Sequence, residues 1–166
     1  MTGSAHWYPA YVGIGSNLDG PASQVKDAIG LLDEVQGVRL VATSSLYRSG
    51  AFGGIEQPDF VNAVAGLLTT MTADELLVEL QAIESRQGRE RDELRWGPRV
   101  IDLDLLVYSA QEIDGPELTL PHPGIGERNF VLLPLAEIAP DLAVPGLGRV
   151  VSIPVSRVEP SISRIA

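Results

Sequence analysis

Residues 8–16 read YPAYVGIGS, a run rich in aromatic and β-branched side chains that ends at Gly15-Ser16-Asn17. This composition predicts a first strand over Tyr8–Ser16. Gly20-Pro21 then marks a helix start, and Gly37 suits the end of that helix. Between them, apolar residues recur at helical spacing, namely Val25, Ala28, Ile29 and Leu32. The opening of the chain therefore predicts a strand followed by an amphipathic helix.

The next part of the chain predicts two strands separated by a loop. Val38–Tyr47 has the composition of a second strand, and Phe60–Leu68 that of a third. Between them, Ser49–Pro58 contains Gly50, Gly53 and Gly54, which predicts a loop that is flexible enough to move.

A second helix and a fourth strand follow. Thr72 and Glu75 form a capping-box pattern, and Gly88 marks the helix end. The core face of this helix is predicted to be Leu76, Leu80, Ile83 and Gln87. Arg89–Pro98 is then a loop and Val100–Tyr108 a strand, and a short helix is predicted over Arg128–Leu133.

The predicted order is β-α-β-β-α-β, which defines an α+β fold of the ferredoxin-like type, with an antiparallel sheet and helices on one face. The sequence contains no internal repeat and no linker, so we expect a single domain over residues 1–166. Beyond Pro154 no element can be assigned, and the tail is predicted to be poorly ordered.

Composition excludes several classes of protein. Hydrophobic residues make up 45% of the 166, which supports a buried core and argues against disorder. The chain has no cysteine, which removes disulfides, thiolate metal sites and cysteine nucleophiles. A net charge of −10 argues against nucleic acid as a partner. With no apolar run of bilayer length and no signal-peptide pattern, we expect a cytoplasmic protein that does not bind membranes.

An arginine cluster and an acidic pair lie close together in the sequence. Five of the twelve basic residues fall within residues 86–99, as Arg86, Arg89, Arg91, Arg95 and Arg99. Arginine suits phosphate oxygens, although interleaved acids also fit a solvated surface. Just downstream, Asp102 and Asp104 lie on one face of the predicted strand, where they could hold Mg²⁺ or simply face solvent. Because anion-binding and cation-binding groups lie side by side, the sequence favours a site that binds a metal–nucleotide complex.

Other candidates carry weaker signals, and two familiar phosphate motifs are absent. Residues 13–20 do not form G-x-G-x-x-G, and no P-loop motif occurs. Phe60 and Asn62 share a strand face and could hold a flat heterocycle, or could serve only the core and a loop cap. Each of the remaining candidates has both a binding and a purely structural interpretation: Trp96 in the arginine-rich loop, His122 between two prolines, and Gln81 with Glu84 on the second helix.

Taken together, these residues resemble the 6-hydroxymethyl-7,8-dihydropterin pyrophosphokinase family of folate biosynthesis. The resemblance spans about residues 11–140, and its most specific part is the block Arg95-Trp96-Gly97-Pro98-Arg99 with Asp102 and Asp104. The other matching segments are GSNL at 15–18, SSLYR at 44–48, QPDFVNA at 57–63, LPHP at 120–123 and ERNFVL at 127–132.

The resemblance implies transfer of the β,γ-pyrophosphoryl group of ATP to the hydroxymethyl oxygen of the pterin, with AMP as the leaving group. It implies two Mg²⁺ ions on Asp102 and Asp104, and charge stabilisation by Arg89 and Arg99. On the ATP side it implies Gln81, Glu84, Arg91, Trp96, Arg99, Leu105, Leu118, Thr119, His122 and Arg128. On the pterin side it implies Ser49, Gly50, Phe52, Phe60, Asn62, Trp96 and Phe130.

The sequence departs from the family pattern at Gly124 and Gly126, where members often carry an arginine and a histidine, and at Gly50, Ala51 and Phe60. We expect a monomer. Two other functions stay open: a catalytically silent ATP- and pterin-binding module, and a kinase that transfers one phosphoryl group to the same pterin. Residue chemistry does not separate transfer of one group from transfer of two; only the resemblance does.

Overall fold

Six strands form one antiparallel sheet in the computed structural model, which describes residues 5–18, 20–50, 57–88, 101–155 and 160–165. The long strands β1 (Tyr8–Ser16) and β4 (Phe60–Thr69) pair at its centre, and β5 (Asp102–Tyr108) forms one edge beside β1. Against β4 lie β2 (Val38–Thr43) and β3 (Tyr47–Ser49), and β10 (Ile162–Arg164) pairs with β3. If β2 and β3 are counted as one strand, the elements from β1 to β5 follow the predicted β-α-β-β-α-β order.

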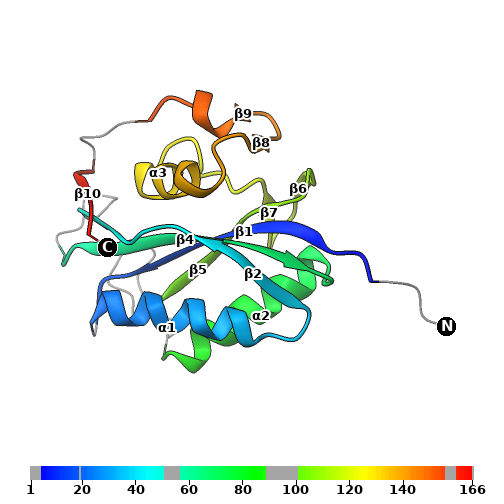
Figure 1. The fold of residues 1–166 in the computed structure, drawn as a ribbon, viewed down its shortest axis with the longest axis horizontal. Coiled ribbons are helices and arrows are strands. Elements are labelled where there is room, and N and C mark those ends of the chain that lie inside the picture. The colour runs from blue at the N-terminus through cyan, green and yellow to red at the C-terminus, as the bar shows by residue number, and fades with distance from the viewer. Residues whose placement is uncertain (1–4, 19, 51–56, 89–100, 156–159, 166) are drawn as a thin grey trace.

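Helices cover both faces of this sheet (Figure 1). On one face lie α1 (Pro21–Glu34) and α2 (Ala73–Arg86), and on the other lies α3 (Asn129–Ile138). Beside α3 are the hairpin of β8 (Ala143–Val144) and β9 (Gly148–Arg149) and a 3₁₀ turn over Val150–Ser152. The prediction of helices on one face only is therefore wrong for α3. A second short hairpin follows β5, formed by β6 (Ile113–Asp114) and β7 (Thr119–Leu120).

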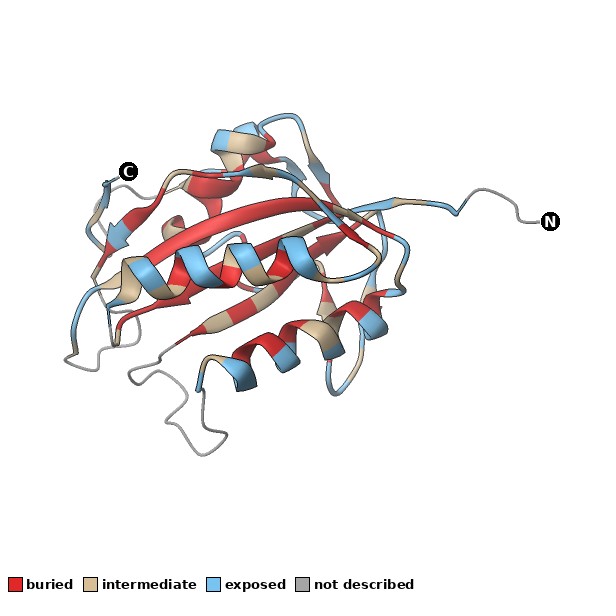
Figure 2. Ribbon diagram, turned by 60° about the horizontal axis from the view of Figure 1, so that its bottom comes forward, coloured by how far each residue is buried: buried red, intermediate tan, exposed pale blue. Residues whose placement is uncertain are grey.

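Each face of the sheet has its own hydrophobic cluster, as expected when side chains alternate along a strand. The α1–α2 side buries Val12, Ile14, Leu103 and Leu105 of the sheet. The α3 side buries Val64 and Leu106 against Leu132 and Leu135 of the helix. Figure 2 shows the buried residues along the central strands between these layers.

The first half of the chain confirms most of the sequence-based elements. Strand β1 has the predicted bounds, and Val25, Ala28 and Leu32 are fully buried on α1. Thr72 and Glu75 form the predicted capping box, and Gln87 follows the helix end, partly buried. The single strand predicted over Val38–Tyr47 is wrong.

That segment divides into β2 and β3 because Ser44 interrupts the regular ladder. Its amide donates to the Val64 carbonyl at 2.9 Å, while its Oγ accepts from the Val64 amide at 2.9 Å. Next to it, the Ser45 amide bonds to Glu137 of α3 rather than to a strand. Between β2 and β3, the Ser44 hydroxyl thus replaces a backbone carbonyl as acceptor for β4, and the Ser45 amide bonds to a side chain of α3.

The C-terminal half departs further from expectation. Helix α3 continues five residues past Leu133, with Pro134 inside it, because Leu135 beyond the proline is fully buried against the sheet. The tail predicted to be poorly ordered instead contributes β10 over Ile162–Arg164. Among the described helices, none is both long and apolar enough to cross a bilayer.

Candidate active site

The acidic pair lies on the edge strand β5 as predicted. Asp102 and Asp104 are half-buried, and Leu103 and Leu105 between and after them are buried toward α1 and α2. The two carboxylates therefore share the opposite face of the strand. Among the described residues no group of three or more histidine or acidic side chains gathers to hold a metal.

Two glycines of β1 lie opposite these aspartates. Gly15 pairs with Asp102 and Gly13 with Asp104, so no β1 side chain crowds the acidic face. On the other side of β1, Gly15 pairs with Asn62 of β4. A Cβ on Gly15 would lie 2.8 Å from Asn62 Oδ1, which shows that the amide extends over this glycine. Asn62, Gly15 and Asp102 thus form one row across the sheet.

Asn62 belongs to a group of predicted pterin-binding residues near the end of β3 and the start of β4. Its Nδ2 donates to Ser49 Oγ at 2.8 Å, and both side chains are buried. Phe60 pairs with Ser49 in register and lies half-buried on the same strand face as Asn62. Phe130, in the first turn of α3, packs against the cluster on that side of the sheet. The structure thus brings Ser49, Phe60, Asn62 and Phe130 to one side of the sheet, and the shared strand face of Phe60 and Asn62 is the one that the sequence predicted.

His122 and Arg128 lie on the acidic side of this row. The Gly124 amide donates to His122 Nδ1 at 3.0 Å, so Nδ1 carries no proton and Nε2–H is the donor. Burial lowers the pKa of His122, and the charge of Arg128 lowers it further, while Asp102 acts in the opposite direction. The imidazole is therefore a neutral hydrogen-bond donor at neutral pH.

A pocket of about 260 Å³ opens beside Asp104 and His122, between α2, β5 and the β6–β7 hairpin. It collects three further residues predicted for ATP, namely Leu105, Leu118 and Thr119. The remaining lining residues are Leu77, Leu103, Gly115, Pro116, Glu117 and Pro123. The structure therefore brings four predicted ATP-binding residues, His122 among them, to one cavity that includes a predicted metal ligand.

Two other predicted ATP-binding residues lie on α2. Gln81 is exposed one turn beyond Leu77, on the same face of the helix. Glu84 is buried, and its Oε2 accepts a 2.8 Å hydrogen bond from the Leu103 amide. Because Leu103 lies between the two aspartates, Glu84 fixes the backbone that presents them.

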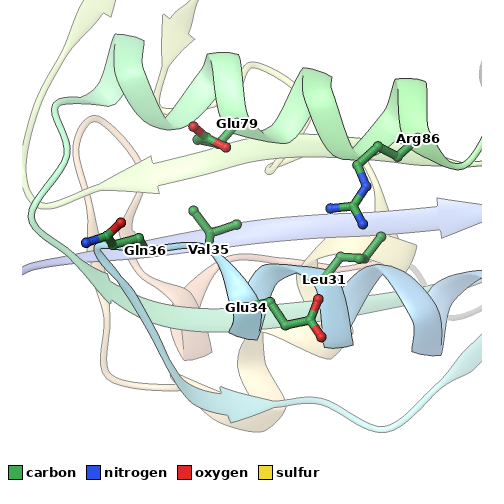
Figure 3. A pocket seen from close by; sticks show the side chains of 6 residues that line it. All are labelled: Leu31, Glu34, Val35, Gln36, Glu79 and Arg86. Atoms are coloured by element: carbon green, nitrogen blue, oxygen red, sulfur yellow. The ribbon is translucent and has the colours of Figure 1, made fainter.

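The larger surface pocket, about 410 Å³, lies between α1 and α2 (Figure 3). It is lined by Leu31, Glu34, Val35, Gln36, Glu79 and Arg86. Of the predicted site residues that the structure describes, none lines it. Volume alone therefore does not identify the site here. Five other predictions lie outside the described residues: Phe52, Arg89, Arg91, Trp96 and Arg99.

Sequence reasoning missed several contacts that hold this region together. Asn17 is buried and its Nδ2 donates to Gln57 Oε1 and the Pro58 carbonyl, both at 2.9 Å, just before Phe60. Asn129 is buried beside Phe130. A Cβ on Gly124 would lie 2.7 Å from Arg128 Nε. Asn17, Gln57, Pro58 and Asn129 lie in segments that carry the family resemblance, and Gly124 departs from the family pattern, but the sequence did not indicate which contacts these residues make.

Comparison with known proteins adds independent evidence. Residues 11–140 match the family model of 7,8-dihydro-6-hydroxymethylpterin-pyrophosphokinase. The chain is 50% identical over 135 residues to 2-amino-4-hydroxy-6-hydroxymethyldihydropteridine pyrophosphokinase of Pseudomonas aeruginosa, covering 81% of this chain and 83% of that one. It is 46% identical over 136 residues to the Haemophilus influenzae protein of that name, covering 82% and 84%.

A solved structure shares the fold. The Plasmodium falciparum HPPK-DHPS structure with pterin and p-hydrobenzoate superposes with a TM-score of 0.68 at 13% identity, covering 92% of this chain and 44% of that one. At that identity the likeness shows the fold alone. The class of protein defined by the sequence relatives is the pyrophosphokinase, a diphosphotransferase enzyme. This chain belongs to the 7,8-dihydro-6-hydroxymethylpterin-pyrophosphokinase family.

Proposed function

We propose that this chain transfers pyrophosphate from ATP to 6-hydroxymethyl-7,8-dihydropterin in folate biosynthesis. The hydroxymethyl oxygen attacks the β-phosphorus, the bond from that phosphorus to the α,β-bridging oxygen breaks, and AMP leaves. The hydroxyl proton passes to solvent. One observation carries the proposal: the row of Asn62, Gly15 and Asp102 joins a predicted pterin side to the pocket beside Asp104 and His122.

On the nucleotide side, the cavity of Leu105, Leu118 and Thr119 suits the apolar faces of an adenosine. His122 would donate Nε2–H to a phosphate oxygen without adding charge, and Arg128 would supply the charge. Gln81, Glu84 and Arg91 are proposed for the same ligand on the family resemblance. For Glu84, the bond to Leu103 supports an indirect part, through the strand that carries both aspartates.

Asp102 and Asp104 fit the Mg²⁺ ions that the resemblance implies. They are half-buried oxygen donors on one strand face with glycines opposite, so phosphate oxygens and water could complete the coordination. We propose that they hold two ions together with ATP. Bound there, Mg²⁺ would neutralise charge on the triphosphate.

On the pterin side, Asn62 would read the polar edge of the ring while Phe60 and Phe130 stack on its faces. Ser49 holds the Asn62 amide by the 2.8 Å bond, which fixes its orientation. Gly50, Phe52 and Trp96 are proposed to complete this side. Arg89 and Arg99 are proposed to stabilise charge on the transferred group, because phosphoryl-type transfer depends mainly on positioning and electrostatics.

Product analysis tests the proposal. Purified protein is incubated with ATP, Mg²⁺ and 6-hydroxymethyl-7,8-dihydropterin, and the nucleotides are separated by chromatography. We expect AMP in equal amount to pterin diphosphate. ADP would identify a simple kinase, and ATP binding without turnover would identify a silent binding module.

The metal ligands have their own test. Asp104→Ala should reduce turnover by several orders of magnitude while the melting temperature changes little, because the side chain is half-exposed and serves charge rather than packing. The matched control is Asp114→Ala, an exposed acid in β6, which should keep full turnover. Normal turnover of Asp104→Ala, or Mg²⁺ titrations identical to wild type, would remove the metal assignment.

We further propose that the protein is a monomeric single domain located in the cytoplasm. Sedimentation velocity tests the first part, with a mass of 17.7 kDa expected for the chain. Fractionation of cells with an antibody to the protein tests the second.

A further inference from the structure

The C-terminal residues 160–165, called here the C-terminal strap, lie outside the region matched by the family model, which ends at residue 140. Within the strap, β10 pairs antiparallel with β3, with Ile162 opposite Ser49 and Arg164 opposite Tyr47. The Ile165 amide extends this ladder with a 2.9 Å bond to the Leu46 carbonyl. The strap therefore covers the edge of the sheet next to β3.

The strap holds the residues that begin the pterin side of the site. The Gly50 amide donates to the Ser161 carbonyl at 2.9 Å. A Cβ on Gly50 would contact Ser161 Oγ at 3.4 Å and Pro160 Cβ at 3.8 Å, so the two backbones lie close together. Ser49, paired with Ile162, is in turn the acceptor for Asn62. Through one ladder, the strap fixes Ser49 and Gly50.

The same strap holds the start of α3. Asn129 Nδ2 donates to the Pro160 carbonyl at 2.8 Å, and Asn129 is only 2% exposed. Its Oδ1 is buried with no hydrogen-bond partner among the described residues, so within that part of the chain the bond to Pro160 is what compensates burial of this amide. Phe130 follows directly in the same helical turn.

We propose that the C-terminal strap is a positioning element for pterin binding, which joins the wall of Ser49, Gly50 and Asn62 to the wall of Phe130. The strap does not touch the pterin in this proposal. It fixes the separation of two walls that come from β3 and α3, so a pterin ring entering between them meets a preformed slot. The inference rests on the proposed function, since it concerns the pterin side of that site.

Strand pairing identifies a point at which to loosen the strap. In an antiparallel pair, hydrogen-bonded and non-hydrogen-bonded residue pairs alternate. The bonds at Gly50–Ser161 and Leu46–Ile165 place the pair Arg48–Ser163, midway between them, in the hydrogen-bonded class. Ser163→Pro removes the amide donor of that pair. Ser163→Ala is the matched control, because the exposed side chain changes and the amide stays.

Asn129→Ala loosens the strap from the other wall. It removes the bond to Pro160 and leaves that carbonyl without this donor, so we expect a folded protein with a modestly lower melting temperature. If Asn129 served only the stability of the fold, Asn129→Ala would leave the affinity for the pterin unchanged. This variant keeps the proposal testable if Ser163→Pro fails to fold.

The experiment measures the dissociation constant of 6-hydroxymethylpterin by calorimetry on the full chain, with Mg²⁺ and α,β-methylene-ATP present. We expect both Ser163→Pro and Asn129→Ala to weaken pterin binding about tenfold, the effect of about one hydrogen bond. Affinity for α,β-methylene-ATP alone should stay within about twofold of wild type, since its pocket lies at the opposite edge of the sheet. Ser163→Ala should match wild type for both ligands.

Unchanged pterin affinity in Asn129→Ala would overturn the proposal, as would equal weakening for both ligands. Failure of the proposed function has a different signature. In that case wild-type protein would give no AMP in the product assay, or would not bind the pterin at all, before any variant is compared.

Discussion

At the scale of single residues, Gly124 makes room for the guanidinium of Arg128. A Cβ at this position would lie 2.7 Å from Nε and 2.8 Å from Cζ, closer than atoms pack. The Gly124 amide is also the donor to His122 Nδ1. Position 124 thus contacts both groups proposed for the phosphates, His122 through its amide and Arg128 through the space that a Cβ would occupy.

Gly124→Ala should therefore displace Arg128 and raise the KM for ATP about tenfold, with the pterin KM nearly unchanged. Gly126→Ala is a matched control, because a Cβ there meets only Leu147 at 3.7 Å, an ordinary contact. Steady-state kinetics of both variants check the expectation. If the two variants behave alike, the close approach of Arg128 has no role in ATP binding.

His122 predicts a pH dependence of stability. Its pKa in the folded protein is lowered, chiefly by burial, below its ordinary value of 6.5. As pH falls through 6.5, the unfolded chain takes up a proton that the folded protein resists, so stability falls with pH. The stability that depends on a neutral His122 is fully present above pH 6.5. His122→Gln should lose less stability than wild type between pH 7.5 and 5.5 in urea unfolding, and equal losses would contradict the assignment.

At the scale of elements, Glu137 ties α3 to the start of β3. It accepts from the Ser45 amide at 2.9 Å, from Ser45 Oγ at 3.1 Å and from Tyr47 Oη at 2.6 Å. Arg164 of β10 lies 3.8 Å from the same carboxylate. Desolvation raises the pKa of Glu137, but the bonds from Tyr47 and Ser45 together with Arg164 outweigh it, and the net pKa is lowered.

Glu137→Gln should destabilise the protein by about 1–3 kcal/mol at pH 7, because an amide NH₂ replaces an oxygen that accepts hydrogen bonds. The lowered pKa means that this stabilisation is present above the ordinary value of 4.5 and is lost as pH falls further. The difference in unfolding free energy between Glu137→Gln and wild type, measured by chemical denaturation, should thus become smaller below pH 4.5. Glu112→Gln, at an exposed position, serves as control.

At the scale of the whole molecule, two hydrophobic clusters share one sheet. Val64 of β4 and Leu106 of β5 belong to the α3 side, whereas Ala63 and Leu105 beside them belong to the α1–α2 side. Neither layer can lose its packing without exposing one face of the same strands. The row of Asn62, Gly15 and Asp102 lies on the α3 face of the sheet, whereas the pocket beside Asp104 also contacts Leu77 of α2, so the proposed site depends on both layers.

We therefore expect a single unfolding transition. Far-UV circular dichroism, which follows helices on both faces, and near-UV circular dichroism of the tyrosines should give coincident urea curves. Two separated transitions would show that the α3 layer is an independent unit, and would also weaken the proposal that the strap joins it to β3.

Local sequence patterns determined the elements whose causes lie within a few residues. The aromatic and β-branched composition of Tyr8–Ser16, the capping box at Thr72 and Glu75, and the shared strand face of Asp102 and Asp104 each depend on near neighbours, and the structure confirms all three as local features. The resemblance carried by residues 11–140 gave the family, which the comparisons bear out.

Tertiary structure alone decided the rest, because the partners are distant in sequence. Ser44 interrupts a strand through Val64, twenty residues on, and Ser45 depends on Glu137, ninety-two residues away. The tail became a strand because β3 offered it an open edge, and α3 took the second face because that face of the sheet is apolar. Spacing in a sequence carries no record of such pairings, which arise only when the whole chain has packed.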